Sequence, residues 1–370
     1  MRVKTQMGWL LQVIGTGLVI LAIADIYLTV LYPRGDKGII SVPLARGLWH
    51  FFRFSAKTIR RQHDRILSYM GPTLLVATVA VWILLLVIGF ALICWAALGN
   101  EIQMQGQDTP TDFATAIYYS GYSLATLGTG DITPQTNTYR LLMILEAILG
   151  FSVFTITLTY LQSVYNQLIQ RNVFALSLHH RTGKTADAAV LIARLGSNGS
   201  FDSSTRQDLT SMSQNLLNIL ESNHSYPVMG YFRLQEPYYA LARVVFLTMD
   251  TVTLIKSALD EESYRSLIYS AAVKGLEESG MQFLAELTEL FLPSRALHVK
   301  GQSEQIWRSR YYQAVEYLAA QGIATPSNLE AGADLYVSIR RQWNPNIIAL
   351  AKYMEYDWSA ITPSVGQGVD

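Results

Sequence analysis

The sequence predicts an all-α membrane protein. Half of its residues are hydrophobic and only 15% are charged, a lower charge content than soluble domains usually carry. Three apolar segments are long enough to cross a bilayer, and the more highly charged C-terminal half repeats its apolar residues at helical spacing. The apolar residues concentrate before about residue 170. We therefore expect three transmembrane helices followed by a helical bundle.

The three apolar segments cover residues 8–32, 73–98 and about 139–171. Each is as long as the roughly 20 residues that cross about 30 Å of hydrocarbon at about 1.5 Å per residue. Pro33 ends the first segment, which runs on to Leu31 without a small-residue cleavage site. We therefore interpret that segment as a retained helix and not as a signal peptide.

Basic residues are distributed unevenly between the connecting segments. Residues 99–137 contain no lysine or arginine, whereas residues 33–71 contain eight, namely Arg34, Lys37, Arg46, Arg53, Lys57, Arg60, Arg61 and Arg65. Because basic residues near the ends of membrane helices favour the cytoplasmic side, we expect the basic segment in the cytoplasm. This places the N-terminus outside a cell (inner) membrane and the C-terminal half in the cytoplasm.

The basic segment itself predicts an amphipathic helix. Its apolar residues Leu44, Leu48, Phe51, Phe52 and Ile59 recur at helical spacing, and the basic residues occupy mostly other positions. We expect this helix to lie along the inner membrane surface in contact with lipids. Packing against the C-terminal half is the alternative.

A fourth apolar stretch, residues 111–125, is too short to cross a membrane and is typical of a re-entrant helix. Thr109, Thr111 or Asp112 is placed to cap its N-terminus. The stretch is followed at once by six residues with glycine at alternate positions, Thr126-Leu127-Gly128-Thr129-Gly130-Asp131.

Alternating glycines let successive carbonyl oxygens point to one side of the backbone. A ring of such carbonyls, with one strand from each subunit, can replace the water shell of a dehydrated cation. We therefore expect a cation at the carbonyl oxygens of Thr126, Leu127, Gly128 and Thr129, and the resemblance described below implies that this ion is potassium. The C-terminal end of the short helix would direct its partial negative charge toward the ion.

This order of span, short helix, loop and span resembles the potassium-channel pore-loop superfamily, in particular bacterial two-pore-helix channels of the ion transport 2 type. The similarity covers roughly residues 72–165 and is carried by Phe113, Ala116, Tyr118, Tyr119, Ser120, Thr126, Gly128, Gly130, Asp131, Thr133, Pro134, Arg140, Glu146 and Gly150. The resemblance implies a homotetrameric channel that conducts potassium passively. The first span is similar to an extra peripheral helix of some bacterial relatives.

The loop departs from the family pattern, which usually reads Thr-Val-Gly-Tyr-Gly-Asp. Thr129 replaces the tyrosine that braces the filter from behind, so a weakly selective cation channel is an alternative, with sodium as a second permeant ion. Tyr119 or Tyr122 is a candidate to fill the space. A non-conducting membrane-anchored sensor or scaffold is a further alternative.

Three residues within the spans also attract attention. Asp25 and Glu146 are carboxylates inside the membrane, which require partners or water. We expect Asp25 to pair with a basic residue at the cytoplasmic side or with a neighbouring helix, and Glu146 to support the pore helix from behind. Gly150 lies mid-helix, where it acts either as a gating hinge or as a site of close packing.

The sequence thus divides into residues 1–33, 34–71, 72–171 and 172–370: a peripheral helix, the basic helix, a pore domain and a cytoplasmic domain. In the last, we expect helices at 204–222, 236–258, 261–291, 303–321, 327–342 and 345–357, with a break at Leu292-Pro293-Ser294. We expect this domain to assemble the tetramer and to regulate the gate through an unknown ligand or protein.

Several classes of function are not expected. The zero net charge suggests no nucleic-acid partner, and the glycine fingerprint of a dinucleotide-binding domain is absent. The sequence presents no convincing nucleophile-base or metal-ligand constellation, so we predict neither an enzyme nor an organic cofactor.

Overall fold

The computed structural model describes residues 2–32, 38–196, 199–291 and 304–362, without the side chains of residues 2–7, Arg60, Leu290 and Phe291. The predicted end of the first span at Pro33 and the predicted break at Leu292-Pro293-Ser294 lie outside this description. The chain forms two compact units. The membrane unit comprises Met1–Asn166 and His224–Phe232, and the C-terminal unit comprises Gln167–Asn223 and Arg233–Asp370.

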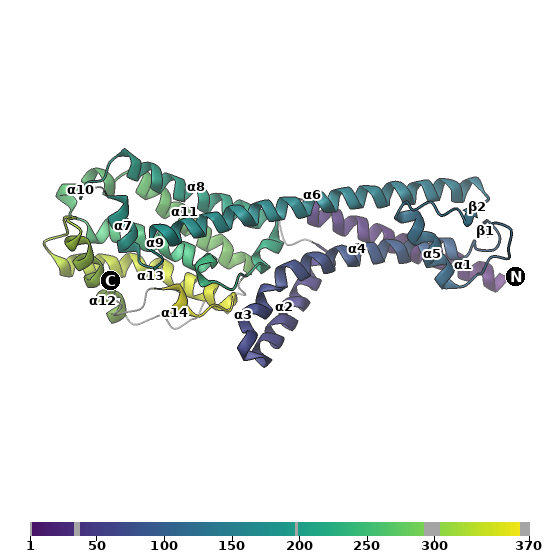
Figure 1. Ribbon diagram of the computed structural model, residues 1–370, viewed down its shortest axis with the longest axis horizontal. Coiled ribbons are helices and arrows are strands. Elements are labelled where there is room, and N and C mark those ends of the chain that lie inside the picture. Colours follow the sequence, from purple (N-terminus) through teal and green to yellow (C-terminus); the bar gives the residue numbers. More distant parts are fainter. Residues whose placement is uncertain (1, 33–37, 197–198, 292–303, 363–370) are drawn as a thin grey trace. The chain divides into compact units, whose positions relative to one another are not determined.

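Three helices among the described residues are long and apolar enough to cross a membrane, as the sequence predicts. They begin with α1 (Arg2–Ile26), which continues into the π-helical turn η1 (Tyr27–Leu31). The others are α4 (Met70–Trp95) and α6 (Asn137–Arg181), both traced in Figure 1. α6 extends ten residues past the polar end expected at Arg171, and its 45 residues correspond to roughly 67 Å of helix.

Glycines bring α1 and α4 into backbone contact. A Cβ atom at Gly15 would lie 2.4 Å from the carbonyl oxygen of Gly89, and one at Gly89 would lie 2.8 Å from a Val19 methyl. Small residues allow membrane helices to pack closely when lipid provides no hydrophobic driving force between them. The first span is therefore fixed to the second at this crossing.

Asp25 connects three elements near the end of α1. Its Oδ2 atom accepts a hydrogen bond from the Trp82 indole of α4 at 2.7 Å, and Oδ1 accepts one from the amide of Ile40 at 2.8 Å. Ile40 precedes α2 (Ser41–Thr58), so the carboxylate lies at the positive end of that helix. The expected neighbouring-helix partner of Asp25 is confirmed, and within the described residues no basic side chain bonds to it.

α2 is followed by a short 3₁₀ turn, η2 (Arg60–Gln62), and by α3 (His63–Ser68). One face of α2 buries Trp49 against Leu67 and Met70, and the Trp49 ring meets the edge of Tyr231 at 6.0 Å. The opposite side exposes Phe51 and Phe54 by 63% and 73%. Contact of the exposed rings with lipid stays a prediction, and the Tyr231 contact agrees with the alternative, packing of this helix against the C-terminal half.

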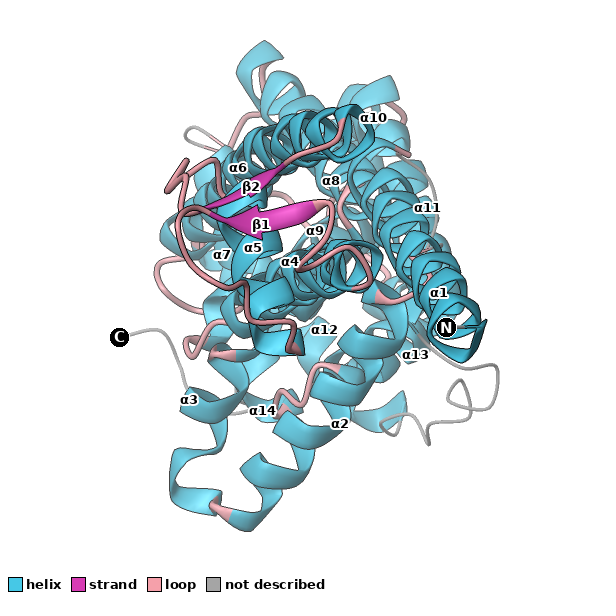
Figure 2. Ribbon diagram, turned by 90° about the vertical axis from the view of Figure 1, so that its right-hand side faces the viewer, coloured by secondary structure: helices cyan, strands magenta, loops and turns pink. Residues whose placement is uncertain are grey.

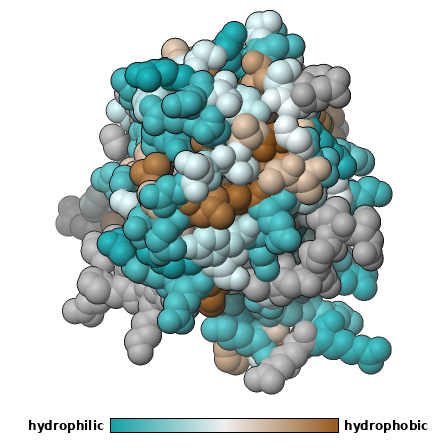
Figure 3. Space-filling model, turned by 90° about the vertical axis from the view of Figure 1, so that its left-hand side faces the viewer, coloured by the Kyte–Doolittle hydropathy of each residue, from teal (hydrophilic) through white to brown (hydrophobic). Residues whose placement is uncertain are grey.

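The C-terminal unit is helical, as the sequence predicts, and Figure 3 shows that one of its faces is mostly hydrophilic. Its elements after α6 are α7 (Ala188–Leu195), α8 (Ser203–Ser225), η4 (Pro237–Tyr239), α9 (Leu241–Ala258), α10 (Glu261–Ile268), α11 (Ala271–Phe291), α12 (Glu304–Ala320), α13 (Leu329–Tyr353) and α14 (Trp358–Ile361). The last residues of α8 and the turn η3 (Pro227–Tyr231) belong to the membrane unit.

Three expectations for this unit differ from the structure. The helix expected at 261–291 is two helices separated at Tyr269-Ser270, and α7 was not predicted. The break expected at residues 342–345 is wrong, because α13 continues through Pro345. A proline inside a helix removes one hydrogen bond, and burial of Trp343, Asn344 and Ile347 on both sides stabilises the continuous helix.

α9 forms the centre of the C-terminal unit and is buried along nearly its whole length. Its Asp250 is fully buried and accepts hydrogen bonds from Arg310 at 2.8 Å, Arg340 at 3.0 Å and Tyr336 at 2.6 Å. These bonds compensate for removal of the charges from water. They join α12 and α13 to the central helix.

Candidate functional site

The short helix between the second and third spans is α5 (Phe113–Leu124). Asp112 is its N-cap, with the side chain accepting a hydrogen bond from the Thr115 amide at 2.9 Å, so one of the three predicted caps is confirmed. The Trp95 indole, at the end of α4, donates to the carbonyl of Thr111 at 3.0 Å. These two bonds fix where the helix begins.

The six-residue loop, residues 126–131, leaves the C-terminal end of α5. Gly128 and Gly130 have φ values of 65° and 74°, the left-handed conformation that alternating glycines were expected to provide. Thr126 also has a positive φ of 56°, while its amide and that of Leu127 bond back to carbonyls of α5. Residues 126–130 are exposed in the single chain.

Hydroxyl groups hold the C-terminal end of this loop in place. The Asp131 carboxylate accepts hydrogen bonds from Thr129 at 2.8 Å and from Tyr118 at 3.0 Å. Tyr122, buried in α5, donates to the carbonyl of Ile132. Thr129 therefore bonds within the loop itself, and tyrosines of α5 reach the residues that follow.

Tyr118 contacts the loop through Asp131, although sequence reasoning named it only as part of the resemblance. Its ring packs edge-on against Tyr122, four residues later on the same face of α5, with 5.3 Å between the ring centres. Tyr119, the other expected support, lies behind Tyr122 with ring centres 5.4 Å apart and reaches no loop residue by a described hydrogen bond. Residues 118 and 122 are four positions apart, and this spacing could have predicted from sequence that the two tyrosines share one face of α5.

Two short strands hold the chain beyond the loop, although none was predicted. β1 (Ile102–Met104) pairs antiparallel with β2 (Ile132–Pro134), with Gln103 opposite Thr133 (Figure 2). The Gln105 amide also bonds to the Asp131 carbonyl at 3.0 Å. The segment before α5 thereby fixes the segment after the loop.

Glu146 lies behind α5, as expected, and is fully buried. The Ser120 hydroxyl lies 2.5 Å from Glu146 Oε1 and 3.2 Å from the Val87 carbonyl oxygen, so α5 is connected to both α6 and α4. The second oxygen of Glu146 and the hydroxyls of Tyr119 and Ser123 have no hydrogen-bond partner among the described residues.

Gly150 packs against the end of α5. A Cβ atom at this position would lie 1.9 Å from the carbonyl oxygen of Leu124, the last residue of α5. The close-packing interpretation of this glycine is therefore confirmed, and its action as a hinge stays a prediction. Because Leu124 precedes the loop by two residues, α6 and the loop are mechanically connected here.

Below the loop, α6 presents large apolar side chains to the outside. Phe151, Phe154 and Leu158 are each more than half exposed, and Tyr160 is buried. A cavity with about 1080 Å³ of empty space, its open side included, is lined by Phe151, Phe154, Leu124 and Thr126 among others.

The spans and the intervening short helix and loop have the order of elements that the sequence predicted. Residues 77–167 match the model of the family Ion_trans_2, described as an ion channel, so this segment is similar to the pore domain of ion channels. The chain is also similar to a curated relative, the uncharacterized membrane protein YdjJ of Bacillus subtilis (strain 168), with 26% identity over 241 residues. That similarity covers 64% of this chain and 67% of the relative. No solved structure matches the chain.

Proposed function

We propose that this protein is one subunit of a homotetrameric cation channel that conducts potassium passively through the backbone carbonyls of residues 126–129. The observation that carries the proposal is the left-handed conformation of Gly128 and Gly130 directly after the C-terminus of α5. This conformation lets successive carbonyl oxygens of the loop point to one side. One such strand cannot surround an ion, whereas four copies around an axis can, so the proposal requires a tetramer. No chemical step is required.

The exposed surface of α6 supports assembly with further copies. Apolar residues recur every three or four positions and each is at least 49% exposed in the single chain: Leu141, Ile144, Leu145, Ile148, Phe151, Phe154 and Leu158. A stripe with this spacing fits a neighbouring helix or lipid. Farther along α6, Ile169 and Val173 are exposed as well. These two residues lie beyond the roughly 20 residues of α6 that can cross a bilayer.

The charge distribution supports an orientation in which the loop 99–137 is outside and the C-terminal unit is in the cytoplasm. In this orientation α5 enters from the outer side of the cell (inner) membrane. We propose that the C-terminal unit regulates the pore through α6, which runs from one unit into the other. The described residues of the C-terminal unit do not identify the ligand or protein partner that would act on it.

Liposomes containing the purified full-length protein test the proposal. We expect potassium flux driven by a concentration gradient, and loss of most of that flux in Gly130→Ala, because alanine is strained at a φ of 74°. Gly106→Ala is the matched control, since Gly106 has a φ of 73° and no atom near its Cβ position. The scaffold alternative predicts no flux from any of the three proteins.

Weak selectivity is a second possibility favoured by one observation: Thr129 bonds to Asp131 within the loop, where the family tyrosine would brace the filter. Reversal potentials with potassium on one side and sodium on the other distinguish the two. If the permeabilities for potassium and sodium are nearly equal, the protein is a weakly selective cation channel and not a potassium channel.

The brace at Asp131 yields a further prediction. Thr129→Val and Tyr118→Phe each remove one hydroxyl donor to Asp131, and each loss is expected to cost about 1 kcal/mol of loop stability. We expect each variant to change the ratio of potassium to sodium permeability by up to about fivefold. Reversal potentials measure the change, with Thr16→Val, an exposed hydroxyl on α1, as the control. Unchanged ratios in both variants would show that the two bonds do not brace the loop.

A further inference from the structure

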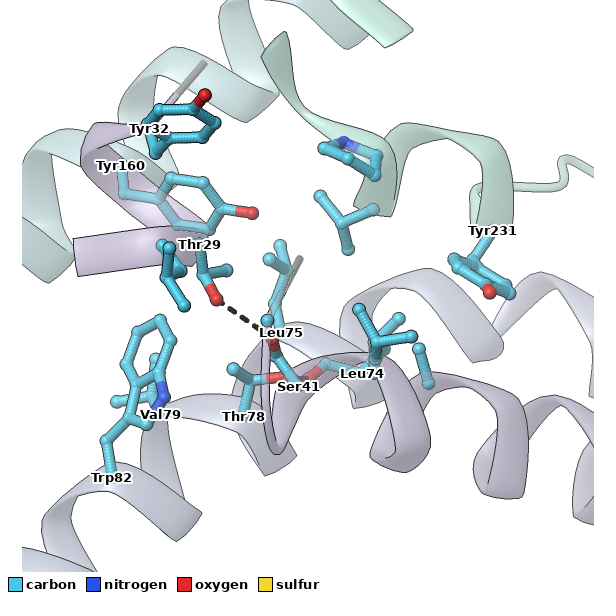
Figure 4. Close-up of a pocket in the computed structure, with 16 residues that line it drawn as sticks. Thr29, Tyr32, Ser41, Leu74, Leu75, Thr78, Val79, Trp82, Tyr160 and Tyr231 are labelled. Carbon is cyan, nitrogen blue, oxygen red and sulfur yellow. Dashed lines mark hydrogen bonds between the residues drawn. The ribbon is translucent and has the colours of Figure 1, made fainter. Parts of the chain in front are cut away.

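A pocket opens in the membrane unit near one end of the spans (Figure 4). Its walls come from η1, α2, the early turns of α4, Tyr160 of α6 and the turn η3. About 630 Å³ of empty space lies between these walls, the open mouth included. The α4 residues that line it run from Leu74 to Trp82, roughly 6–18 Å along the helix from its first residue. These residues belong to the first half of the second span, α4.

The lining determines which kind of ligand fits. Among the residues that the structure describes, those that line the pocket are mostly aliphatic and aromatic, and none carries a charge. An ionic ligand group would meet no counter-charge on these walls, at a large cost in desolvation. The pocket favours a neutral, largely apolar occupant.

Most polar groups of the wall already have partners. The hydroxyls of Thr29 and Ser41 lie 2.8 Å apart, and Thr78 donates to the Leu74 carbonyl at 2.8 Å. The Trp82 indole donates to Asp25. None of these groups needs a ligand to satisfy its hydrogen-bonding capacity.

Tyr160 is different. Only 5% of this residue is exposed, it lines the pocket, and no hydrogen bond joins its hydroxyl to another described residue. Figure 4 shows the hydroxyl directed into the open space of the pocket. The ring is held from behind by Tyr226, whose ring centre lies 5.9 Å away. A donor that faces an apolar pocket without a protein acceptor can form its hydrogen bond with an acceptor on a ligand.

We propose that this pocket binds one acyl chain of a glycerolipid from the surrounding bilayer, with the lipid ester carbonyl accepting a hydrogen bond from the Tyr160 hydroxyl. An ester-linked chain has the required chemistry, because it joins one neutral acceptor to a long apolar body. The lipid is also the solvent of the spans that form the walls. Any effect of the bound lipid on conduction rests on the proposed function, but binding itself does not.

Photolabelling of the full-length protein in vesicles tests the site. The probe is a phosphatidylcholine whose ester-linked acyl chain carries a diazirine, and mass spectrometry locates the adducts. We expect adducts on pocket residues such as Leu75, Val79 and Tyr160. Tyr160→Phe retains the ring and is expected to lower pocket adducts about fivefold, the effect of one neutral hydrogen bond.

Three controls make the result specific. Tyr165→Phe, a half-exposed tyrosine on the same helix that does not line the pocket, is expected to leave labelling unchanged. Val79→Trp is expected to fill the pocket and remove its adducts. The ether analogue of the probe lacks the carbonyl, so Tyr160→Phe is expected to have no effect on its labelling.

The proposal is overturned if pocket adducts are absent, or if Tyr160→Phe and the wild type are labelled equally by the ester probe. It is also overturned if a diazirine-bearing fatty alcohol labels the pocket while the phospholipid does not, since a free amphiphile would then be the occupant. Labelling without any ion flux would support the lipid site and count against the channel.

Discussion

Gly150→Ala is expected to remove most of the ion flux. The added methyl group would lie 1.9 Å from the Leu124 carbonyl oxygen, so α6 and the end of α5 must separate. Overpacking of this kind costs about 1–3 kcal/mol. This energy changes the equilibrium constant between two conformations by a factor of about 5 to 150. Because Leu124 leads directly into residues 126–131, we expect the shift to distort the loop. Flux from liposomes and reversal potentials measure both consequences.

The matched control is Gly17→Ala on α1, where an added Cβ atom meets nothing within 4 Å. Equal flux from Gly150→Ala and the wild type would show that the contact relaxes easily. The two roles of Gly150 also differ in outcome. Displacement of the loop changes ion selectivity, whereas loss of a hinge changes only the fraction of time that the pore is open.

Asp25→Ala is expected to destabilise the membrane unit strongly. The substitution removes a fully buried carboxylate that accepts hydrogen bonds from the buried Trp82 indole and from the partly buried Ile40 amide. An unsatisfied buried donor costs about 1–3 kcal/mol, so we expect a loss of about 1–3 kcal/mol from the Trp82 indole and a smaller further loss from the Ile40 amide. Thermal unfolding of the protein in detergent, followed by exposure of Cys94 to a thiol reagent, measures the loss. Cys94 is buried in α4 and becomes reactive only when the unit opens.

Asp108→Ala removes an exposed carboxylate from the loop before α5 and is expected to leave the unfolding temperature unchanged. Trp82→Phe removes one donor but keeps an aromatic ring, so its effect is expected to be smaller than that of Asp25→Ala. An Asp25→Ala protein as stable as the wild type would contradict the role of the carboxylate in joining α1, α2 and α4.

The spans and the pore helix could be predicted from sequence because each depends on local information. Apolar length identifies a membrane helix, and the start of α5 was predicted to within a few residues from three possible caps, of which the structure uses Asp112. The alternating glycines predicted the backbone conformation at residues 128 and 130 for the same reason.

The partners of individual side chains could not be predicted in this way. The donors to Asp25 come from Trp82, 57 positions away, and from the backbone of Ile40. The contact of Gly150 with Leu124 depends on how two helices cross. Strands of three residues, such as β1 and β2, carry too short a pattern to distinguish them from a turn.

The return of residues His224–Phe232 to the membrane unit affects how truncated proteins should be interpreted. Phe232 packs against Gly71, where a Cβ atom would lie 2.6 Å from its ring, and Tyr231 covers Trp49. Deleting everything after α6 would therefore also strip a buried surface from α2 and α4. A shortened chain that conducts poorly would report this damage together with any loss of regulation, whereas point changes confined to α9–α13 would leave the membrane unit intact.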